Sequence, residues 1–352
     1  MVKPSSRPAV MYDVARLAGV SHQTVSRVLN DHPNVRPETR DRVRRAIEQL
    51  NYRPNKLAKG LVTRRSGRVG VITLGSRLYG PTSTLMGIEQ AARSAGYTVT
   101  IMVVEPGVTH LRAAVASMSE QSVEGIIVIT PNVTGARTVS ALPPDIPVVA
   151  VEAGYSESVP VASVDQHEGA RLATEHLLAL GHRTVRHVAG PEDWLEAQER
   201  VEGWRAALSD AAVPAPPLLR GDWTAASGYR AALELEPAED LTALFVANDH
   251  MALGVLRGLQ QRGIRVPEDV SVVGFDDIPE AEFLLPPLTT VRQDFDAVGR
   301  LGVRLLAELI AGADRPAPER IRPSLIVRAS TAPPAAARAT SLAAPTARAP
   351  RH

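Results

Sequence analysis

Five side chains that form directional hydrogen bonds lie close together near the N-terminus. They are His22, Gln23, Thr24, Ser26 and Arg27. A glutamine amide can pair bidentately with adenine and an arginine guanidinium with guanine, and each good pair discriminates between bases by roughly 1–3 kcal/mol. At the start of one helix, these groups would suit the recognition of base edges in a DNA groove. His22 and Gln23 are the main candidates for sequence specificity.

The elements that must hold these side chains are three short helices, each with apolar residues recurring on one face. The three faces comprise Val14, Leu17 and Ala18; Val25, Val28 and Leu29; and Val43, Ile47 and Leu50. Gly19 can end the first helix, Ser21 can cap the second, and Pro37 suits the first turn of the third. The pattern predicts a helix, a tight turn and a second helix, closed by the third around a small core.

The N-terminal segment is strongly basic. Residues 1–65 contain 14 Lys and Arg against 5 Asp and Glu, whereas the remaining chain contains 25 against 33. Further polar residues are candidates for phosphate contacts, which set the register on DNA without reading its sequence. These are Tyr12, Asn30, Asn34 and Arg40. From the residues alone, an amphipathic hairpin with a solvated charged face on an enzyme remains an alternative.

From residue 69 the pattern changes to short apolar runs that alternate with helical stretches. The runs are VGVITL, VTIMVV, GIIVI, PVVAV, VRHVAG, ALFVAND and VSVVGFDD. Such runs are typical of buried parallel strands joined by crossover helices, so we expect an α/β body. Some end in polar pairs, Asn248-Asp249 and Asp276-Asp277. Because ligands of α/β sheets bind at the carboxyl ends of strands, we expect a ligand site there.

Composition disfavours several classes of protein. The absence of cysteine excludes disulfides, zinc fingers and thiol catalysis. The sequence has no secretory h-region and no run of about 18 apolar residues, so we expect a cytoplasmic protein with no membrane partner. A nucleotide-binding enzyme is one alternative, but no glycine-rich phosphate loop, metal-ligand spacing or nucleophile elbow supports it. A solute-binding transport protein is another, disfavoured by the basic N-terminal segment.

The order of these motifs resembles the LacI/GalR family of bacterial transcription regulators. The resemblance is carried by YDVARLAGVS-QTVSRVLN and TR-RV-AI-LNYRPN-LA-GL, then by GDWTAASGYR, VANDHMALGVLR, DVSVVGFDD and PPLTTVRQDF, up to about residue 330. It implies an all-α helix-turn-helix head with a hinge helix, followed by an α/β two-lobed periplasmic-binding-protein-like effector domain. It also implies a homodimer that binds a pseudo-palindromic operator in double-stranded DNA. We expect no enzymatic activity, cofactor or metal.

The segment from Asn55 to Val62 resembles the family's hinge helix, which enters the minor groove. By this resemblance Leu61 is the wedge at the central base step, and an apolar wedge can kink a flexible step; an ordinary linker leucine is the alternative. Lys56 and Lys59 would supply charge near phosphates, and Gly60 would weaken a free hinge helix. The expected DNA-binding residues are Tyr12, Ser21, His22, Gln23, Thr24, Ser26, Arg27, Asn30, Asn34, Asn55, Lys56, Ala58, Lys59 and Leu61.

The resemblance also implies a sugar site in the body. Planar hydrogen-bonding groups suit adjacent hydroxyls, and an aromatic face suits the C–H surface of a sugar. Arg200, Asn248 and Asp276 match sugar-contacting positions of the family's galactoside-responsive members, and Trp223 matches a stacking tryptophan. The rest of the expected site comprises Leu78, Pro81, Glu152, Gln293 and Phe295. Singly, a surface charge, a helix cap and a packing tryptophan are alternatives for Arg200, Asp276 and Trp223.

Two departures limit what the resemblance implies about the ligand. Glu152 replaces an aspartate of those members, and Ile129 stands where they have an asparagine. We therefore expect a galactoside or related oligosaccharide as a class. Two lobes joined by crossings near residues 160, 292 and 320 would close on it. Release of a repressor by sugar is the mechanism that the resemblance favours, and a corepressor-dependent regulator of another small metabolite is the alternative.

The expected organisation has four parts. Residues 9–54 would form the helix-turn-helix domain and residues 55–66 the hinge helix and linker. Residues 67–330 would form the two-lobed effector-binding and dimerisation domain, and residues 331–352 a disordered tail rich in Ala, Pro and Arg. Since this tail lacks the leucine heptads that could join dimers into tetramers, we expect a dimer.

Overall fold

The chain divides into two compact units, residues 1–66 and 67–352. A computed structural model describes residues 9–52, 65–74, 78–105, 107–140, 146–152, 154, 158–235, 241–314 and 319–335. The first unit is the head and the second is the body. Within the described residues, no helix is long and apolar enough to cross a membrane.

The described part of the head contains α1 (Met11–Ala18), α2 (His22–Leu29) and α3 (Pro37–Gln49). Gly19 ends α1 in the left-handed conformation at φ 62°, which a residue without Cβ adopts without strain. The Ser21 side chain accepts a hydrogen bond from the Thr24 amide at 3.1 Å and caps α2. Val14, Val25 and Val43 lie buried between the helices. The predicted helix, tight turn and helix are confirmed.

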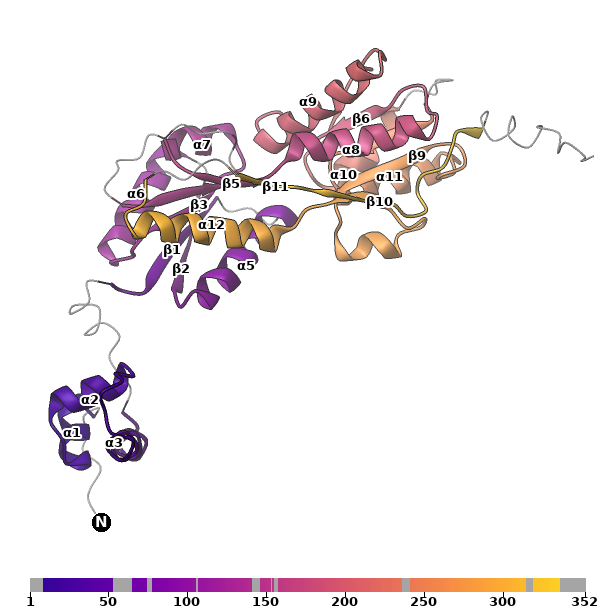
Figure 1. Ribbon diagram of the computed structural model, residues 1–352. Helices are drawn as coiled ribbons and strands as arrows, with labels where there is room; N and C mark the ends of the chain where they lie inside the picture. Colours follow the sequence, from indigo (N-terminus) through magenta and orange to yellow (C-terminus); the bar gives the residue numbers. More distant parts are fainter. Residues whose placement is uncertain are drawn as a thin grey trace, which may run out of the picture. The chain divides into compact units, whose positions relative to one another are not determined.

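The first lobe of the body is a six-stranded parallel sheet with two helices on each face (Figure 1). Its strands, in spatial order, are β11 (Glu319–Ile321), β5 (Val161–Val164), β4 (Val148–Val151), β3 (Ile126–Ile129), β1 (Arg68–Thr73) and β2 (Thr98–Val103). Apolar side chains of α5 (Tyr79–Ser94) and α12 (Phe295–Ile310) cover one face. Those of α6 (Val108–Glu120) and α7 (Val133–Ser140) cover the other.

The second lobe repeats this three-layer architecture. Its strands, in spatial order, are β12 (Ser324–Ile326), β10 (Thr289–Arg292), β9 (Ser271–Asp276), β8 (Ala243–Val246), β6 (Arg186–Ala189) and β7 (Leu219–Arg220). β12 is antiparallel to β10, and the other pairs are parallel. One face is covered by α8 (Gln166–Ala179) and α9 (Leu195–Asp210). The other is covered by α10 (Ala225–Glu234) and α11 (Asp249–Gln261), and the 3-10 helix η1 (Pro279–Phe283) follows β9.

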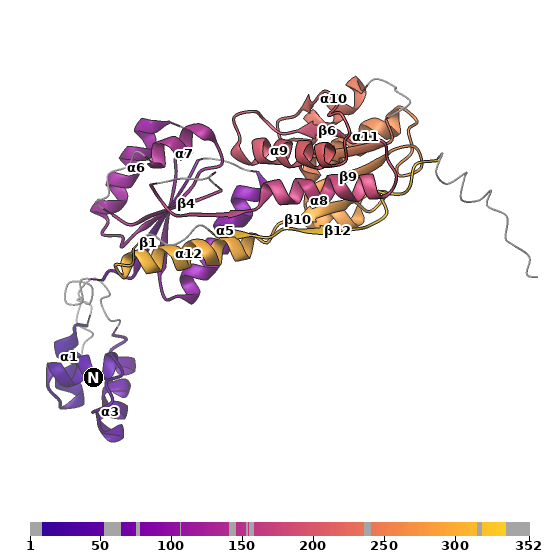
Figure 2. The same cartoon turned by 45° about the horizontal axis from the view of Figure 1, so that its top comes forward.

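The chain passes between the lobes three times (Figure 2). The crossings lie between β5 and α8, between β10 and α12, and between β11 and β12. They fall at about residues 165, 293 and 322, within a few residues of the expected positions. Both lobes are therefore built from segments that are far apart in the sequence.

The seven apolar runs are confirmed as strands, but β5, β7, β10, β11 and β12 had no such run to predict them. β7, β11 and β12 are two or three residues long and partly exposed at or near the edges of their sheets, so they need no apolar pattern. The packed chain also continues past residue 330. Thr331 contacts His176 at 3.0 Å and the Ala332 carbonyl accepts from Ser271 at 2.9 Å, so the expected tail boundary was too early. Residues 336–352 lie outside the described residues.

Candidate functional site

The start of α2 presents the predicted base-reading side chains to solvent. His22, Gln23 and Arg27 are exposed, whereas Thr24 and Ser26 are half-buried. Ser21 caps this helix and also hydrogen-bonds the Thr24 hydroxyl at 2.9 Å. The exposed trio is free to contact a groove, while the hydroxyl of Ser21 first serves to fix the end of the helix.

The side chains predicted to contact phosphates differ in their exposure and in the hydrogen bonds that they form within the head. Tyr12 is 67% exposed, and Asn34 is exposed. The Asn30 amide donates to the Ser26 carbonyl at 2.9 Å. Arg40 donates to the Asp31 carboxylate and to the His32 carbonyl, both at 2.9 Å, and therefore holds the loop after α2 in the free head. The hinge predictions, Asn55, Lys56, Ala58, Lys59, Gly60 and Leu61, lie outside the described residues.

In the body, the two lobes touch through backbone hydrogen bonds. The Leu195 amide donates to the Pro131 carbonyl at 3.0 Å, and the Val133 amide donates to the Asp193 carbonyl at 3.1 Å. These contacts join the loop after β3 to the loop before α9. Ile129 at the end of β3 is paired with Val151 at the end of β4. The contacts between the two loops therefore also bring the first turn of α9 close to the end of β4.

Arg200 lies at the centre of the polar residues between the lobes and is 2% exposed. Its Nε donates to Gln166 Oε1 at 2.9 Å, and its Nη1 donates to the Ala247 carbonyl. The guanidinium lies 4.0 Å from the centroid of the Phe275 ring, a distance suited to a cation–π contact. The alternative of a surface charge on α9 is therefore wrong.

Gln166, Gln293 and Asp276 form a chain of hydrogen bonds beside this arginine. Gln166 Nε2 donates to Gln293 Oε1, and Gln293 Nε2 donates to Asp276 Oδ1, both at 2.7 Å. The register of β9 and β10, which pairs Asp276 with Arg292, places these side chains together. Gln166 and Gln293 directly follow two of the crossings between the lobes. Gln166 was not predicted, and its position next to a crossing is the signal that could have identified it.

An aromatic wall stands beside the polar chain. Trp223 is 5% exposed, has φ 72° and lies edge to face with Trp194 at 5.5 Å between centroids. The Arg200 guanidinium is 5.4 Å from the Trp223 ring. The Asn248 side chain donates to the Trp223 carbonyl at 3.2 Å and caps α11 by accepting from Met251 at 2.9 Å. Asn248 thus supports the unusual backbone conformation of the tryptophan.

Three buried carboxyl groups face this region. Burial raises the pKa of Asp276 to about 6 and that of Glu196 to about 7, although Arg200 opposes both shifts. The pKa of Glu152 is raised well above its ordinary value, mainly by burial and secondly by repulsion from the Glu196 carboxylate. Glu196 was not predicted, because an acidic residue in the first turn of a helix is ordinarily interpreted as a favourable helix-end charge.

The other predicted effector residues lie at the start of two helices of the first lobe. Pro81 is buried, and Leu78 packs against the apolar core of the second lobe. Phe295 begins α12 and meets Tyr79 edge to face at 5.7 Å between centroids. Phe295 and Gln293 line a cavity of about 690 Å³ between α5 and α11. Ile129, at the position where an asparagine was expected, is fully buried in the core.

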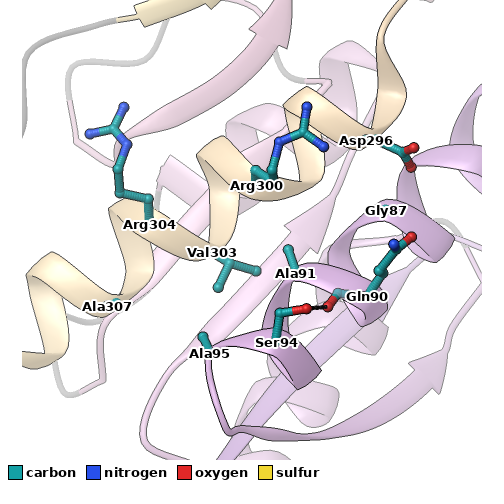
Figure 3. Close-up of a pocket in the computed structure, with 10 residues that line it drawn as sticks. All are labelled: Gly87, Gln90, Ala91, Ser94, Ala95, Asp296, Arg300, Val303, Arg304 and Ala307. Carbon is teal, nitrogen blue, oxygen red and sulfur yellow. Dashed lines mark hydrogen bonds between the residues drawn. The ribbon is translucent and has the colours of Figure 1, made fainter.

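A separate hollow of about 370 Å³ lies on the first lobe between α5 and α12 (Figure 3). Its two arginines from α12 are paired within the protein. Arg304 contacts Glu308 at 3.0 Å, and Arg300 contacts Asp294 at 3.7 Å. None of the predicted effector residues lines this hollow.

Comparisons with known proteins agree with both units. Residues 10–55 match the family model for bacterial regulatory proteins of the lacI family, and residues 174–331 match a periplasmic binding protein-like domain. The lactose operon repressor of Escherichia coli (strain K12) is 36% identical over 333 residues, which cover 93% of this chain and 92% of that protein.

Solved structures give the same result. The lac repressor dimer bound to operator and the anti-inducer ONPF has a TM-score of 0.83 and 35% identity, covering 93% of this chain and all of that one. A complex of the transcriptional regulator CelR with cellobiose has a TM-score of 0.68 and 33% identity, covering 92% and 99%. These relatives are transcription regulators and not enzymes. The chain belongs to the LacI family of bacterial transcription regulators.

Proposed function

We propose that this repressor binds a pseudo-palindromic operator as a homodimer, and that a small sugar bound between the lobes of the body releases it. The observation that carries the proposal is the buried polar chain of Arg200, Gln166, Gln293 and Asp276 beside Trp223. It combines bidentate hydrogen-bonding groups with an aromatic face, as a polyol site requires. The similarity to the lac repressor and to CelR favours a sugar as the class of ligand, but it does not identify the sugar as a galactoside.

Release would follow from competition within this chain of hydrogen bonds. A sugar hydroxyl that binds Arg200 or Asp276 takes hydrogen bonds that Gln166 and Gln293 use in the free protein. These two glutamines are bonded to each other and directly follow two of the three crossings. Ligand binding would therefore favour a different arrangement of the crossings. To weaken operator binding 5- to 150-fold, the sugar must prefer that arrangement by about 1–3 kcal/mol.

Exposed apolar side chains support the proposed dimer. The first lobe exposes Met86 and the edge-strand residues Ile101 and Val103, and the second lobe exposes Phe283 and Leu285, the latter by 91%. Large apolar side chains are typical of subunit interfaces, where a partner removes them from water. A mass measurement in solution tests this, and a stable monomer or tetramer would contradict the proposed dimer.

The function is tested by titrating the protein with operator fragments in the presence and absence of neutral galactosides and glucosides. We expect affinity for a specific palindrome to fall when the correct sugar is added, while weak non-specific binding stays unchanged. A rise in affinity would instead support the corepressor mechanism. If no sugar changes operator affinity, the sensing function is wrong.

DNA reading is tested separately. Gln23→Ala should relax specificity at one base position by about 1–3 kcal/mol, and Gln49→Ala, at an exposed position of α3, is the matched control. Leu61→Ala should weaken specific binding and spare non-specific binding if Leu61 is a wedge. Equal losses of both kinds of binding would contradict the wedge.

A further inference from the structure

The proposed effector site contains more buried acidic groups than its single buried cation can hold in the ionised form. Glu152, Glu196 and Asp276 are all buried or nearly so. Arg200 acts on all three, and His250 acts in addition on Asp276. Glu199 adds a further negative charge near Glu196. A neutral polyol would leave this imbalance in place.

The contacts of Arg200 limit how far it neutralises its neighbours. Nε and Nη1 are used by Gln166 and by the Ala247 carbonyl. Nη2 is the nitrogen that approaches the carboxylates, and it lies 3.9 Å from both Glu196 and Asp276. That distance exceeds a hydrogen bond, so one nitrogen is shared between two acidic groups without binding either closely.

Glu152 brings a third carboxyl group from the opposite lobe. It is 4% exposed and has φ 60°, a left-handed conformation that is uncommon for residues other than glycine. Its Oε1 accepts from the Thr84 hydroxyl, whereas Oε2 is buried with no hydrogen-bond partner among the described residues. A buried polar atom without a partner is costly, so this oxygen is available to a ligand.

The backbone hydrogen bonds between the lobes place Glu152 near Glu196. Leu195, which donates to the first lobe, immediately precedes Glu196 in α9. Gly154, two residues after Glu152, lies against the Leu195 side chain. Two acidic residues of opposite lobes therefore approach each other, and Glu196 acts on Glu152 as a repelling charge. A positive group between them would convert this repulsion into attraction on both sides.

We propose that the effector is an amino sugar, whose protonated amine binds between Glu152 and Glu196 while its ring lies against Trp223. This inference rests on the proposed sensing function and specifies its ligand class. Arg200, Asp276 and Asn248 would bind hydroxyl groups of the same molecule. The ammonium supplies hydrogen-bond donors for the unpartnered Oε2 of Glu152, and it brings the positive charge that the site lacks.

The protonation of the site provides a direct signature. Burial raises the pKa of Glu152 and Glu196, so in the free protein at mildly acidic pH these groups hold protons. An ammonium ion favours the ionised carboxylates, and binding of an amino sugar must then release protons. A neutral sugar leaves the protons in place.

The experiment compares matched sugars on the full-length protein. Two sets of probes are compared. The first is glucosamine with its neutral partners glucose and N-acetylglucosamine. The second is the β-1,4-linked glucosamine disaccharide with its neutral partners cellobiose and the diacetylated disaccharide. Calorimetric titrations at mildly acidic pH, in two buffers of different ionisation enthalpy, give both affinity and protons released. We expect an amine to bind at least tenfold more tightly than its neutral partners and to release close to one proton.

Variants assign the effect to the two carboxylates. Glu196→Gln and Glu152→Gln should each lower the ratio of amine affinity to neutral-sugar affinity and the number of protons released on binding of the amine. Glu202→Gln, at an exposed position of the same helix α9, is the matched control and should keep both. If a variant fails to fold, the number of protons that the unmodified protein releases on binding the amine still tests the proposal.

The two proposals fail differently. If neutral sugars weaken operator binding and the amines bind no better, or release no proton, the amino-sugar inference is overturned and the sensing function stands. If no sugar of either kind changes operator affinity, the sensing function fails and the inference falls with it.

Discussion

The close packing of Trp223 on Gly190 gives a sharp prediction for Gly190→Ala. A methyl group at this position would stand 2.7 Å from Trp223 Cζ3 and closer still to Cη2 and Cζ2. Ordinary contacts begin at 3.4 Å, so the indole ring must move by most of an ångström. The ring is 5% exposed and bounded by Trp194 and Arg200, and little space is open to it.

The expected cost is that of overpacking a buried site, about 1–3 kcal/mol. At about 2–4 °C for each kcal/mol, the melting temperature should fall by roughly 2–12 °C. Displacement of the ring also removes the face against which a sugar would lie, so effector affinity should fall about tenfold. Gly80→Ala is the matched control, because its methyl would meet Phe295 at an ordinary 3.7 Å.

A double-mutant cycle tests the reasoning itself. Trp223→Phe removes the outer ring atoms with which the new methyl collides. In that background Gly190→Ala should cost little, and a coupling energy of about 1–3 kcal/mol should appear between the two positions. If Gly190→Ala is equally costly in both backgrounds, contact with the tryptophan is not the cause.

Three further predictions concern other parts of the molecule. Ser21→Ala should destabilise the head by about 1 kcal/mol, whereas Ser21→Asn should retain the helix cap. Hydrogen exchange of the α2 amides measures this, and equal exchange rates in both variants would contradict a capping role. The folded-state pKa of Glu196, about 7, exceeds its unfolded value near 4.3, so its contribution to stability is present at low pH and lost as pH rises from about 4 to 7. Glu196→Gln should therefore gain stability relative to the unmodified protein across that window, and parallel melting profiles would refute this. Asp277→Asn should weaken the 2.6 Å contacts to Arg292 and Arg328 and destabilise the body by about 1–3 kcal/mol. Denaturant titrations measure this, and an unchanged unfolding midpoint would show that these ion pairs are dispensable.

Local signals in the sequence predicted what local interactions determine. Gly19, Ser21 and Pro37 end and begin helices because of their own backbone and side-chain chemistry, and all three do so in the structure. Six of the seven apolar runs became inner strands, where burial on both faces demands apolar residues, and the seventh became the edge strand β2. Arg200 and Asp276 were identified through their place in motifs, and the structure brings them within 3.9 Å of each other.

What the sequence did not predict depends on how distant elements meet. Gln166 is an ordinary polar residue in the first turn of α8, and only the packing of α8 on α9 makes it a neighbour of Arg200 and Glu196. Glu196 stands one turn before Arg200 in α9, but the pattern of the sequence does not show that it is turned into the site between the lobes. Trp194 meets Trp223, 29 positions later in the chain, within the second lobe, and its backbone also pairs with Asn132 of the first lobe. The short strands β11 and β12 are specified by their neighbours in the sheets and carry little pattern of their own.

The three crossings also determine when the body can fold. The core of the first lobe includes Val298, Leu301 and Leu305 of α12, and its edge strand is β11. The second lobe is completed by β12 and by the buried Ser330. During synthesis, therefore, neither lobe is complete until nearly the whole chain has left the ribosome, whereas the three described helices of the head are complete by residue 49. A chain cut after β5 would leave the first lobe without α12, which supplies part of its core, and without its edge strand β11.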